Sequence, residues 1–205
     1  AGLRDEDGEA SDWIEVHNSG AAAVNLGGLA LTDDAEDTDK WIFPGVSLAA
    51  DGYLVVFASG KDRRPVDGSR LHTNFQLNAD REYLGLYDAS SPRRALSEFA
   101  PEFPPQRPDY SYGLAEGGQR SYFQTPTPGT ANGSASTFAG FVADPAFSVP
   151  HGLYSGALEV AIASRTPGAA VYYTLSGIEP TAATGTPYAG PIVLATTSIF
   201  SSNPT

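Results

Sequence analysis

The sequence of 205 residues contains no cysteine, no methionine and only three histidines. Without cysteine the chain can form no disulfide, no zinc–thiolate site and no thiol nucleophile. The histidines, His17, His72 and His151, have none of the close spacings typical of a histidine metal site. We expect His72 to form hydrogen bonds within the fold. Nucleophile-elbow and phosphate-loop motifs are also missing, and the sequence therefore predicts that the chain is not an enzyme.

The chain has little positive charge. Its 12 Lys and Arg residues face 24 Asp and Glu residues, which gives a net charge of −12 and a pI of about 4.5. A surface of this sign repels phosphate backbones, so we expect no nucleic-acid partner. Residues 133–205 contain only three acidic residues and one basic residue, and the first 132 residues therefore carry most of the net charge.

No apolar run is long enough to span a membrane, and no secretory leader can be recognised. We therefore expect no membrane insertion. Because the sequence begins with Ala1 rather than methionine, we expect it to be a mature segment of a longer protein.

Long segments with apolar residues at helical spacing are also missing, whereas 22 glycines and 16 prolines are typical of many short strands. In residues 12–17, Ile14 and Val16 point to one side, and the residues between them point to the other. Residues 53–58 are apolar on both faces, which predicts a central strand. Other strands are predicted at residues 24–26, 29–32, 41–43, 82–87 and 96–99, the last at an edge. Residues 109–113 and 121–123 are predicted to return to the same sheet.

Five motifs follow one another in the first half: DWIEVHN from Asp12, VNLGGLALTDD from Val24, WIFP from Trp41, YLVVFASG from Tyr53 and LHTNFQL from Leu71. In this order they resemble a bacterial lamin tail domain, which is an immunoglobulin-like β-sandwich. The resemblance covers about residues 5–132. In that family a strand with an Asn-Glu motif usually comes first, and no such strand is recognisable here. The resemblance therefore implies either that this strand lies upstream of Ala1 or that another segment closes the sheet edge. An open edge would be a place where another strand could add.

A second pattern begins at Asp144, after the small residues 133–143, which are typical of a linker. Its pair Tyr173-Thr174, followed by Glu179-Pro180, resembles the C-terminal β-sandwich of chitobiases and β-hexosaminidases, with Ser176 where the family usually has aspartate. That family usually continues for further strands, which implies an incomplete second domain. We therefore predict an all-β protein of two immunoglobulin-like β-sandwich domains, residues 1–132 and 144–205, joined by a short linker.

The loop TDDAEDTDK, residues 32–40, gathers five acidic residues within seven positions: Asp33, Asp34, Glu36, Asp37 and Asp39. Calcium prefers six to eight oxygen ligands, and clustered loop carboxylates can supply several of them. The spacing is not that of an EF-hand. Two interpretations stay open, a solvated acidic loop and a calcium site, and calcium is the one cofactor that the sequence suggests. The partial pattern Asp-x-Asp-Gly at residues 5–8 has the same two interpretations.

Tyr172 and Tyr188 are candidate ligand-binding residues, because aromatic rings stack on sugar faces at little entropic cost. The alternative is that they pack inside the second sandwich, as strand aromatics commonly do.

The two resemblances imply a non-catalytic accessory region of a larger secreted or cell-surface bacterial protein, such as those that carry spore-coat-type kinase domains. Its partners would be proteins or polysaccharides at the cell surface, and it would act by binding or by spacing. One alternative is a carbohydrate-binding module that serves a neighbouring enzyme. Another is a structural assembly module that self-associates by strand addition at the open sheet edge.

Overall fold

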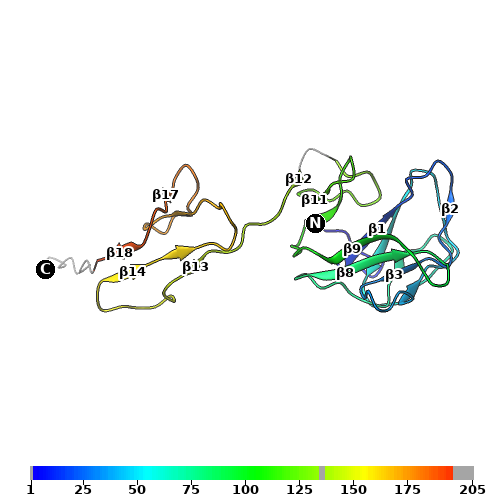
Figure 1. The fold of residues 1–205 in the computed structure, drawn as a ribbon, viewed down its shortest axis with the longest axis horizontal. Helices are drawn as coiled ribbons and strands as arrows, with labels where there is room; N and C mark the ends of the chain where they lie inside the picture. The colour runs from blue at the N-terminus through cyan, green and yellow to red at the C-terminus, as the bar shows by residue number, and fades with distance from the viewer. Residues whose placement is uncertain (1, 134–136, 196–205) are drawn as a thin grey trace. The chain divides into compact units, whose positions relative to one another are not determined.

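The structure is a computed structural model that describes residues 2–133 and 137–195. The described residues form eighteen β-strands and no helix, and none of them forms a segment that could cross a membrane as a helix. The chain divides into two compact units, residues 1–139 and 140–205, hereafter unit 1 and unit 2 (Figure 1). The predicted all-β class, with two immunoglobulin-like domains, is confirmed.

The first sheet of unit 1 has the order β1-β6-β7. Strand β1 (Asp12–His17) pairs antiparallel with β6 (Tyr53–Ala58), and β7 (Leu71–His72) pairs parallel with the other side of β6. Both long strands have the predicted bounds, and β6 is central, as its apolar residues on both faces predict. Ile14 and Val16 are buried, which confirms the predicted alternation in β1.

The second sheet of unit 1 has the order β4-β3-β8-β9. It consists of β3 (Ala30–Thr32), β4 (Trp41–Ile42), β8 (Glu82–Tyr87) and β9 (Ala95–Phe103). Strand β9 lies at an edge, as predicted, and runs on through Pro101, because an edge strand tolerates a residue that cannot donate a ladder hydrogen bond. Two short strands, β2 (Val24–Asn25) and β5 (Ser47–Leu48), pair separately.

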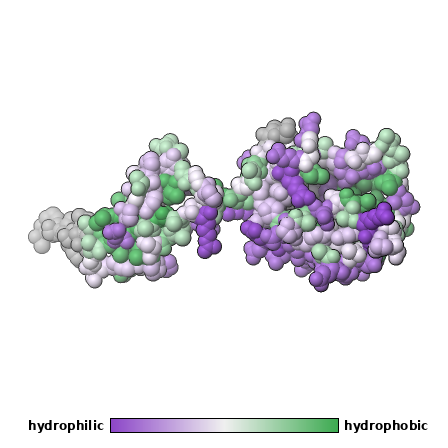
Figure 2. All heavy atoms as spheres, viewed as in Figure 1, coloured by the Kyte–Doolittle hydropathy of each residue, from purple (hydrophilic) through white to green (hydrophobic). Residues whose placement is uncertain are grey.

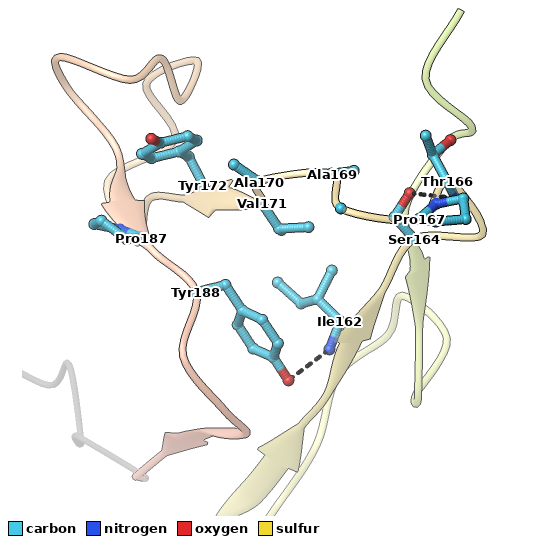
Figure 3. A pocket seen from close by; sticks show the side chains of 11 residues that line it. Ile162, Ser164, Thr166, Pro167, Ala169, Ala170, Val171, Tyr172, Pro187 and Tyr188 are labelled. Atoms are coloured by element: carbon cyan, nitrogen blue, oxygen red, sulfur yellow. Dashed lines mark hydrogen bonds between the residues drawn. The ribbon is translucent and has the colours of Figure 1, made fainter.

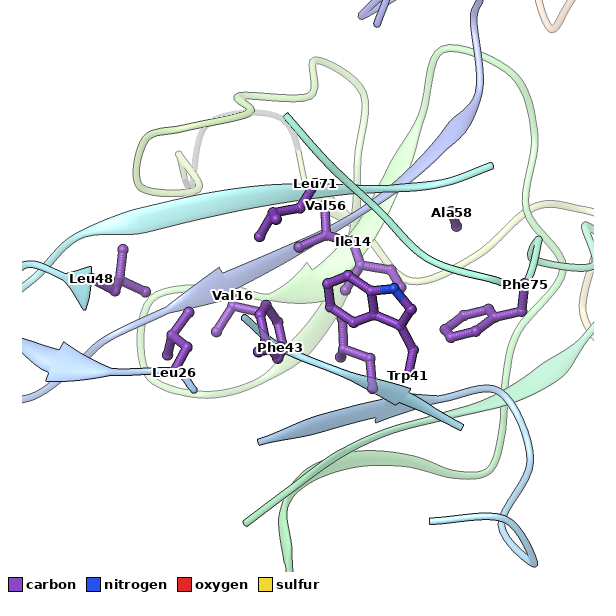
Figure 4. Packing of buried hydrophobic residues seen from close by; sticks show 11 residues of the cluster. Ile14, Val16, Leu26, Trp41, Phe43, Leu48, Val56, Ala58, Leu71 and Phe75 are labelled. Atoms are coloured by element: carbon purple, nitrogen blue, oxygen red, sulfur yellow. The ribbon is translucent and has the colours of Figure 1, made fainter. Parts of the chain in front are cut away.

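The core of unit 1 lies between these sheets (Figure 4). Trp41 is fully buried, and its ring meets that of Phe43 edge-on at 4.8 Å. The cluster of buried side chains consists of Ile14, Val16, Leu26, Leu31, Trp41, Phe43, Leu48, Val56, Ala58, Leu71 and Phe75. Each strand contributes its inward-facing residues, so burial of apolar surface fixes the strand register.

Strands β10, β11 and β12 form a separate sheet in that order, and the prediction that residues 109–113 and 121–123 return to the earlier sheet is wrong. Strands β10 (Ser111–Leu114) and β11 (Arg120–Phe123) form a hairpin, and β12 (Thr137–Phe138) pairs with β11. The rings of Tyr122 and Phe138 stack at 5.3 Å, which places β12 in unit 1 although it lies within the predicted linker, residues 133–143.

The described residues of unit 2 form three two-stranded pairs. Strand β13 (Ala146–Phe147) pairs with β15 (Ile162–Ala163), β14 (Leu158–Val160) with β18 (Ile192–Leu194), and β16 (Tyr172–Tyr173) with β17 (Thr186–Pro187). Among its described residues only Val160 and Ile162 are buried hydrophobics, so this unit has a much smaller core than unit 1.

Candidate functional sites

Four of the five carboxylates of the acidic loop, residues 32–40, contact its backbone or basic side chains. Lys40 Nζ lies 2.5 Å from a carboxylate oxygen of Asp33, and Arg93 Nε donates to Asp39. Asp34 accepts a hydrogen bond from the backbone N–H of Glu36 at 2.9 Å.

Asp37 likewise accepts from the N–H of Asp39 at 3.3 Å. In the described parts of the chain no three His, Cys, Asp or Glu side chains gather at a point where they could share a metal ion. The structure therefore does not bring the five predicted ligands together, and the calcium site stays a prediction.

The N-terminal arm, residues 4–9, is held by one lysine. The side chain of Asp5 is fully buried, and its Oδ1 accepts hydrogen bonds from the N–H groups of Asp7 and Glu9 at 3.0 and 2.9 Å. Lys61 Nζ lies 2.5 Å from Asp5 Oδ2, 2.6 Å from Asp7 Oδ2 and 2.9 Å from Glu9 Oε2. Its hydrogen bond lowers the pKa of Asp5 to about 2. An ammonium group of the protein thus fills the centre of the Asp-x-Asp-Gly turn.

A row of hydroxyl, imidazole and carboxylate groups pins the same arm to β7. The His72 side chain is fully buried, with Nδ1 2.8 Å from Ser59 Oγ and Nε2 3.1 Å from both carboxylate oxygens of Glu6. Arg63 Nη1 lies 2.7 Å from Glu6 Oε1. A carboxylate can only accept hydrogen bonds, so Nε2 carries the proton. The expected role of His72 in hydrogen bonding within the fold is confirmed.

This row has the order of groups found in serine hydrolases, but its setting is structural. Ser59 Oγ also accepts from the N–H of Lys61 at 3.3 Å, and the ring of His72 stacks on Phe57 at 5.3 Å. Neither of the two surface hollows described below includes Ser59 or His72. A general base must lie within hydrogen-bond reach of its substrate, and here the imidazole is enclosed by its own fold.

Tyr172 and Tyr188 line one hollow in unit 2, of about 430 Å³. The hollow is open to solvent, and both side chains are half-buried. Tyr188 is fixed, because its hydroxyl accepts a hydrogen bond from Ile162 N at 3.0 Å and its N–H donates to Val171 O at 2.8 Å. The Tyr172 ring points away from Tyr188 and Ile162 (Figure 3). The structure therefore brings the two predicted residues to one site. Of these two, Tyr188 accepts a hydrogen bond at its hydroxyl, and the described residues provide none at the hydroxyl of Tyr172.

A second hollow, of about 250 Å³, lies where β1 begins. It is lined by residues 10–12 and by Ala58, Gln76 and Leu77. No local sequence pattern indicates this hollow, because its walls come from segments far apart in the chain. Strand β1 itself lies at the edge of its sheet, which agrees with the open edge that the resemblance allowed.

The visible surface of unit 1 is largely hydrophilic, and that of unit 2 carries more hydrophobic residues (Figure 2). The exposed hydrophobic side chains of unit 2 include Phe147, Leu175, Ile178 and Val193, each at least 60% exposed. This difference follows the uneven distribution of charge along the sequence.

Comparison with protein families finds one match within each of the two units. Residues 3–98 match the model of the Lamin Tail Domain, and residues 149–201 match that of the Chitobiase/beta-hexosaminidase C-terminal domain. The two resemblances seen in the sequence are therefore confirmed, in the same order. The first match ends within β9, so strands β10 to β12 lie beyond it. No curated protein and no solved structure matches the chain.

Proposed function

We propose that this chain, in which a lamin tail domain is followed by a chitobiase/β-hexosaminidase C-terminal domain, is an accessory region of a secreted or cell-surface protein that acts by binding or by spacing. Both domains are immunoglobulin-like accessory domains rather than catalytic ones. The proposal rests on the way in which the reactive side chains of unit 1 are enclosed. Lys61 lies among three carboxylates, and the side chain of His72 is fully buried.

An accessory role also agrees with the surfaces. Exposed apolar side chains contribute to most binding interfaces, and unit 2 exposes several large ones. Fold alone does not determine the ligand, so the proposal names a class, a protein or a polysaccharide of the cell surface.

Co-sedimentation of the whole chain with insoluble chitin and with purified peptidoglycan tests this proposal, together with hydrolase assays on the same materials. We expect retention without turnover. Turnover that is abolished by His72→Ala, while the near-ultraviolet spectrum of the variant stays native, would contradict an accessory role and assign the Ser59–His72–Glu6 row to catalysis.

A second candidate function is carbohydrate binding at the hollow of unit 2, which Tyr172 and Tyr188 line. Here Tyr172 would stack on a sugar ring. Titration with chito-oligosaccharides tests it: Tyr172→Ala should weaken binding about tenfold or more, as expected for the loss of one aromatic contact. Tyr154→Ala is the matched control, because Tyr154 is a 45% exposed tyrosine of the same unit that does not line the hollow. Equal loss in both variants would argue against the hollow.

A further inference from the structure

Strand β1 has one hydrogen-bonded edge and one open edge. Asn18, directly after β1, donates its N–H to Gly52 O at 2.9 Å, on the side of β6. In an antiparallel pair, alternate residues direct both backbone groups to the partner, so the residues at odd positions of β1 direct theirs away from it. Phe57, the partner of Trp13 in β6, confirms this assignment. Its C=O accepts from Thr73 N on the far side of β6, so Phe57 directs its backbone groups away from β1.

The open edge therefore presents the N–H and C=O groups of Trp13, Glu15 and His17. Within residues 2–133 and 137–195, backbone hydrogen bonds join β1 to β6 alone.

The other long edges of unit 1 are shielded. The outer side of β7 is paired with the preceding loop, because His72 N donates to Arg63 O and Asp62 N donates to Thr73 O. Strand β9 contains Pro101 and two register shifts, which are common devices against strand addition. Strand β1 has six residues, a regular register and neither proline nor lysine.

The two carboxylates of β1 are not matched by basic side chains. Burial raises the pKa of Asp12 and the pKa of Glu15. Glu15 accepts a hydrogen bond from the N–H of Gly129, and in the described residues neither acid forms an ion pair with Lys or Arg. The arm acids next to β1 are different, since Lys61 and Arg63 pair with them.

We propose that the open edge of β1 binds an extended strand of a partner polypeptide that carries basic side chains. Valine-like residues of this strand would extend the core at Ile14 and Val16, and lysine or arginine would lie on the other face of the strand, opposite Glu15. This inference rests on the proposed binding function and names one class of partner for unit 1.

A second copy of this chain fits the edge less well. Side chains directly opposite in an antiparallel pair share a face, so two β1 strands can be centred on Ile14, on Glu15 or on Val16. The first register places Trp13 opposite Glu15, and the second places the two Glu15 carboxylates together, which is unfavourable. The third places His17 opposite Glu15, but His17 Nε2 already lies 2.9 Å from Asp51 Oδ1. No register places Lys or Arg opposite Glu15, and the net charge of −12 on each chain opposes association.

The experiment is a titration of the whole chain with a synthetic peptide of about eight residues, in which valine alternates with lysine. A peptide with glutamate in place of lysine is the control. We expect the lysine peptide to bind about tenfold more tightly or better, with an affinity that falls as salt is added. Glu15→Gln, which removes the charge and keeps an oxygen that can accept the hydrogen bond from Gly129, should weaken binding of the lysine peptide severalfold.

Two variants of one residue test the edge itself. His17→Pro removes an N–H that points to the open edge and leaves the ladder with β6 intact, whereas His17→Ala removes the same side chain and keeps that N–H. We expect His17→Pro to bind the lysine peptide at least about tenfold more weakly than His17→Ala. Circular dichroism would verify that both variants are folded.

Three results would overturn the inference: equal binding of the two peptides, equal binding by the two His17 variants, or a dimer in sedimentation that His17→Pro dissociates and His17→Ala does not. The last would make a second copy the occupant. If the chain is retained on polysaccharide but does not bind the peptide, the strand-addition inference is wrong and the proposed accessory function still holds. Turnover by the Ser59–His72–Glu6 row would instead overturn that function.

Discussion

Lys61 Nζ and Asp5 Oδ2 lie 2.5 Å apart, although 56 positions separate these residues in the sequence. The Asp5 side chain is fully buried, whereas that of Lys61 is 19% exposed. The contact closes the N-terminal arm onto the loop after β6, and the same ammonium group also binds Asp7 and Glu9. Lys61 therefore contacts three acidic residues of the arm, and Arg63 adds a second contact to Asp7 at 2.8 Å.

Removing that ammonium group should destabilise unit 1. In Lys61→Met the buried Asp5 carboxylate loses its only basic partner among the described residues, and an unpaired buried charge is strongly unfavourable. We expect the melting temperature to fall by about 5 °C or more. Lys40→Met is the matched control, because Lys40 pairs with a single acid, Asp33, and should lower it less. A larger fall in the control would contradict the central role of Lys61.

The arm also predicts a dependence of stability on acid. Lys61 lowers the pKa of Asp5 to about 2, and a hydrogen bond from its own backbone, with Arg63 and His72, lowers the pKa of Glu6 to about 2. Both values lie below those of the unfolded chain, about 4. The native state therefore gains stability above pH 4 and loses it as the pH falls from about 4 to about 2.

The expected melting curve is thus nearly level around neutral pH and falls steeply in acid. Lys61→Met should have a shallower acid slope, because the pKa of Asp5 is then no longer lowered by that ammonium group. Thermal melts at a series of pH values test this, and parallel curves for the two proteins would contradict it. Asp12 and Glu15 have the opposite effect on the dependence of stability on pH. Because burial raises their pKa values, these two groups favour the native state more as the pH falls.

Trp41 provides a prediction about packing. It is fully buried, and its indole Nε1 has no hydrogen-bond partner in the described structure. Trp41→Ala should therefore lower the free energy of unfolding by about 3–5 kcal/mol through the cavity that it leaves. Trp41→Phe keeps an aromatic ring and loses no hydrogen bond, so it should cost clearly less. Urea unfolding compares the two variants, and equal costs would show that Nε1 has a partner in solution.

Local sequence patterns predicted the long strands of unit 1 because the positions of these strands depend on the residues within each strand. In Asp12–His17 the alternation of apolar residues determines which side chains face the core, and in Tyr53–Ala58 the unbroken apolar run predicts a central strand. Strands β10 to β12 have equally local patterns, but the partner of a short strand depends on contacts far along the chain. Phe138, for example, stacks on Tyr122, and the small residues before it are typical of a linker.

The candidate sites were predicted less completely, for the same reason. The acidic residues of the arm are evident in the sequence, but their pairing with Lys61, and that of His72 with Glu6 across 66 positions, depends on the folded chain. The tyrosines Tyr172 and Tyr188 were predicted as a pair and do line one hollow. The hydrogen bond that fixes Tyr188 to Ile162 had no signal in the sequence.

The acidic loop, residues 32–40, leads to a prediction about metal removal. Lys40 pairs with Asp33, and Arg93 with Asp39, so two of the five acids already have a cation of the protein beside them. A ligand that binds only the native state stabilises that state, and at saturating levels the stabilisation grows with the logarithm of the ligand concentration. We expect the melting temperature of the whole chain to be the same in chelator and in millimolar calcium. A rise in calcium that is lost in Asp34→Asn would instead establish the loop as a calcium site, because Asp34 has no basic partner in the described structure.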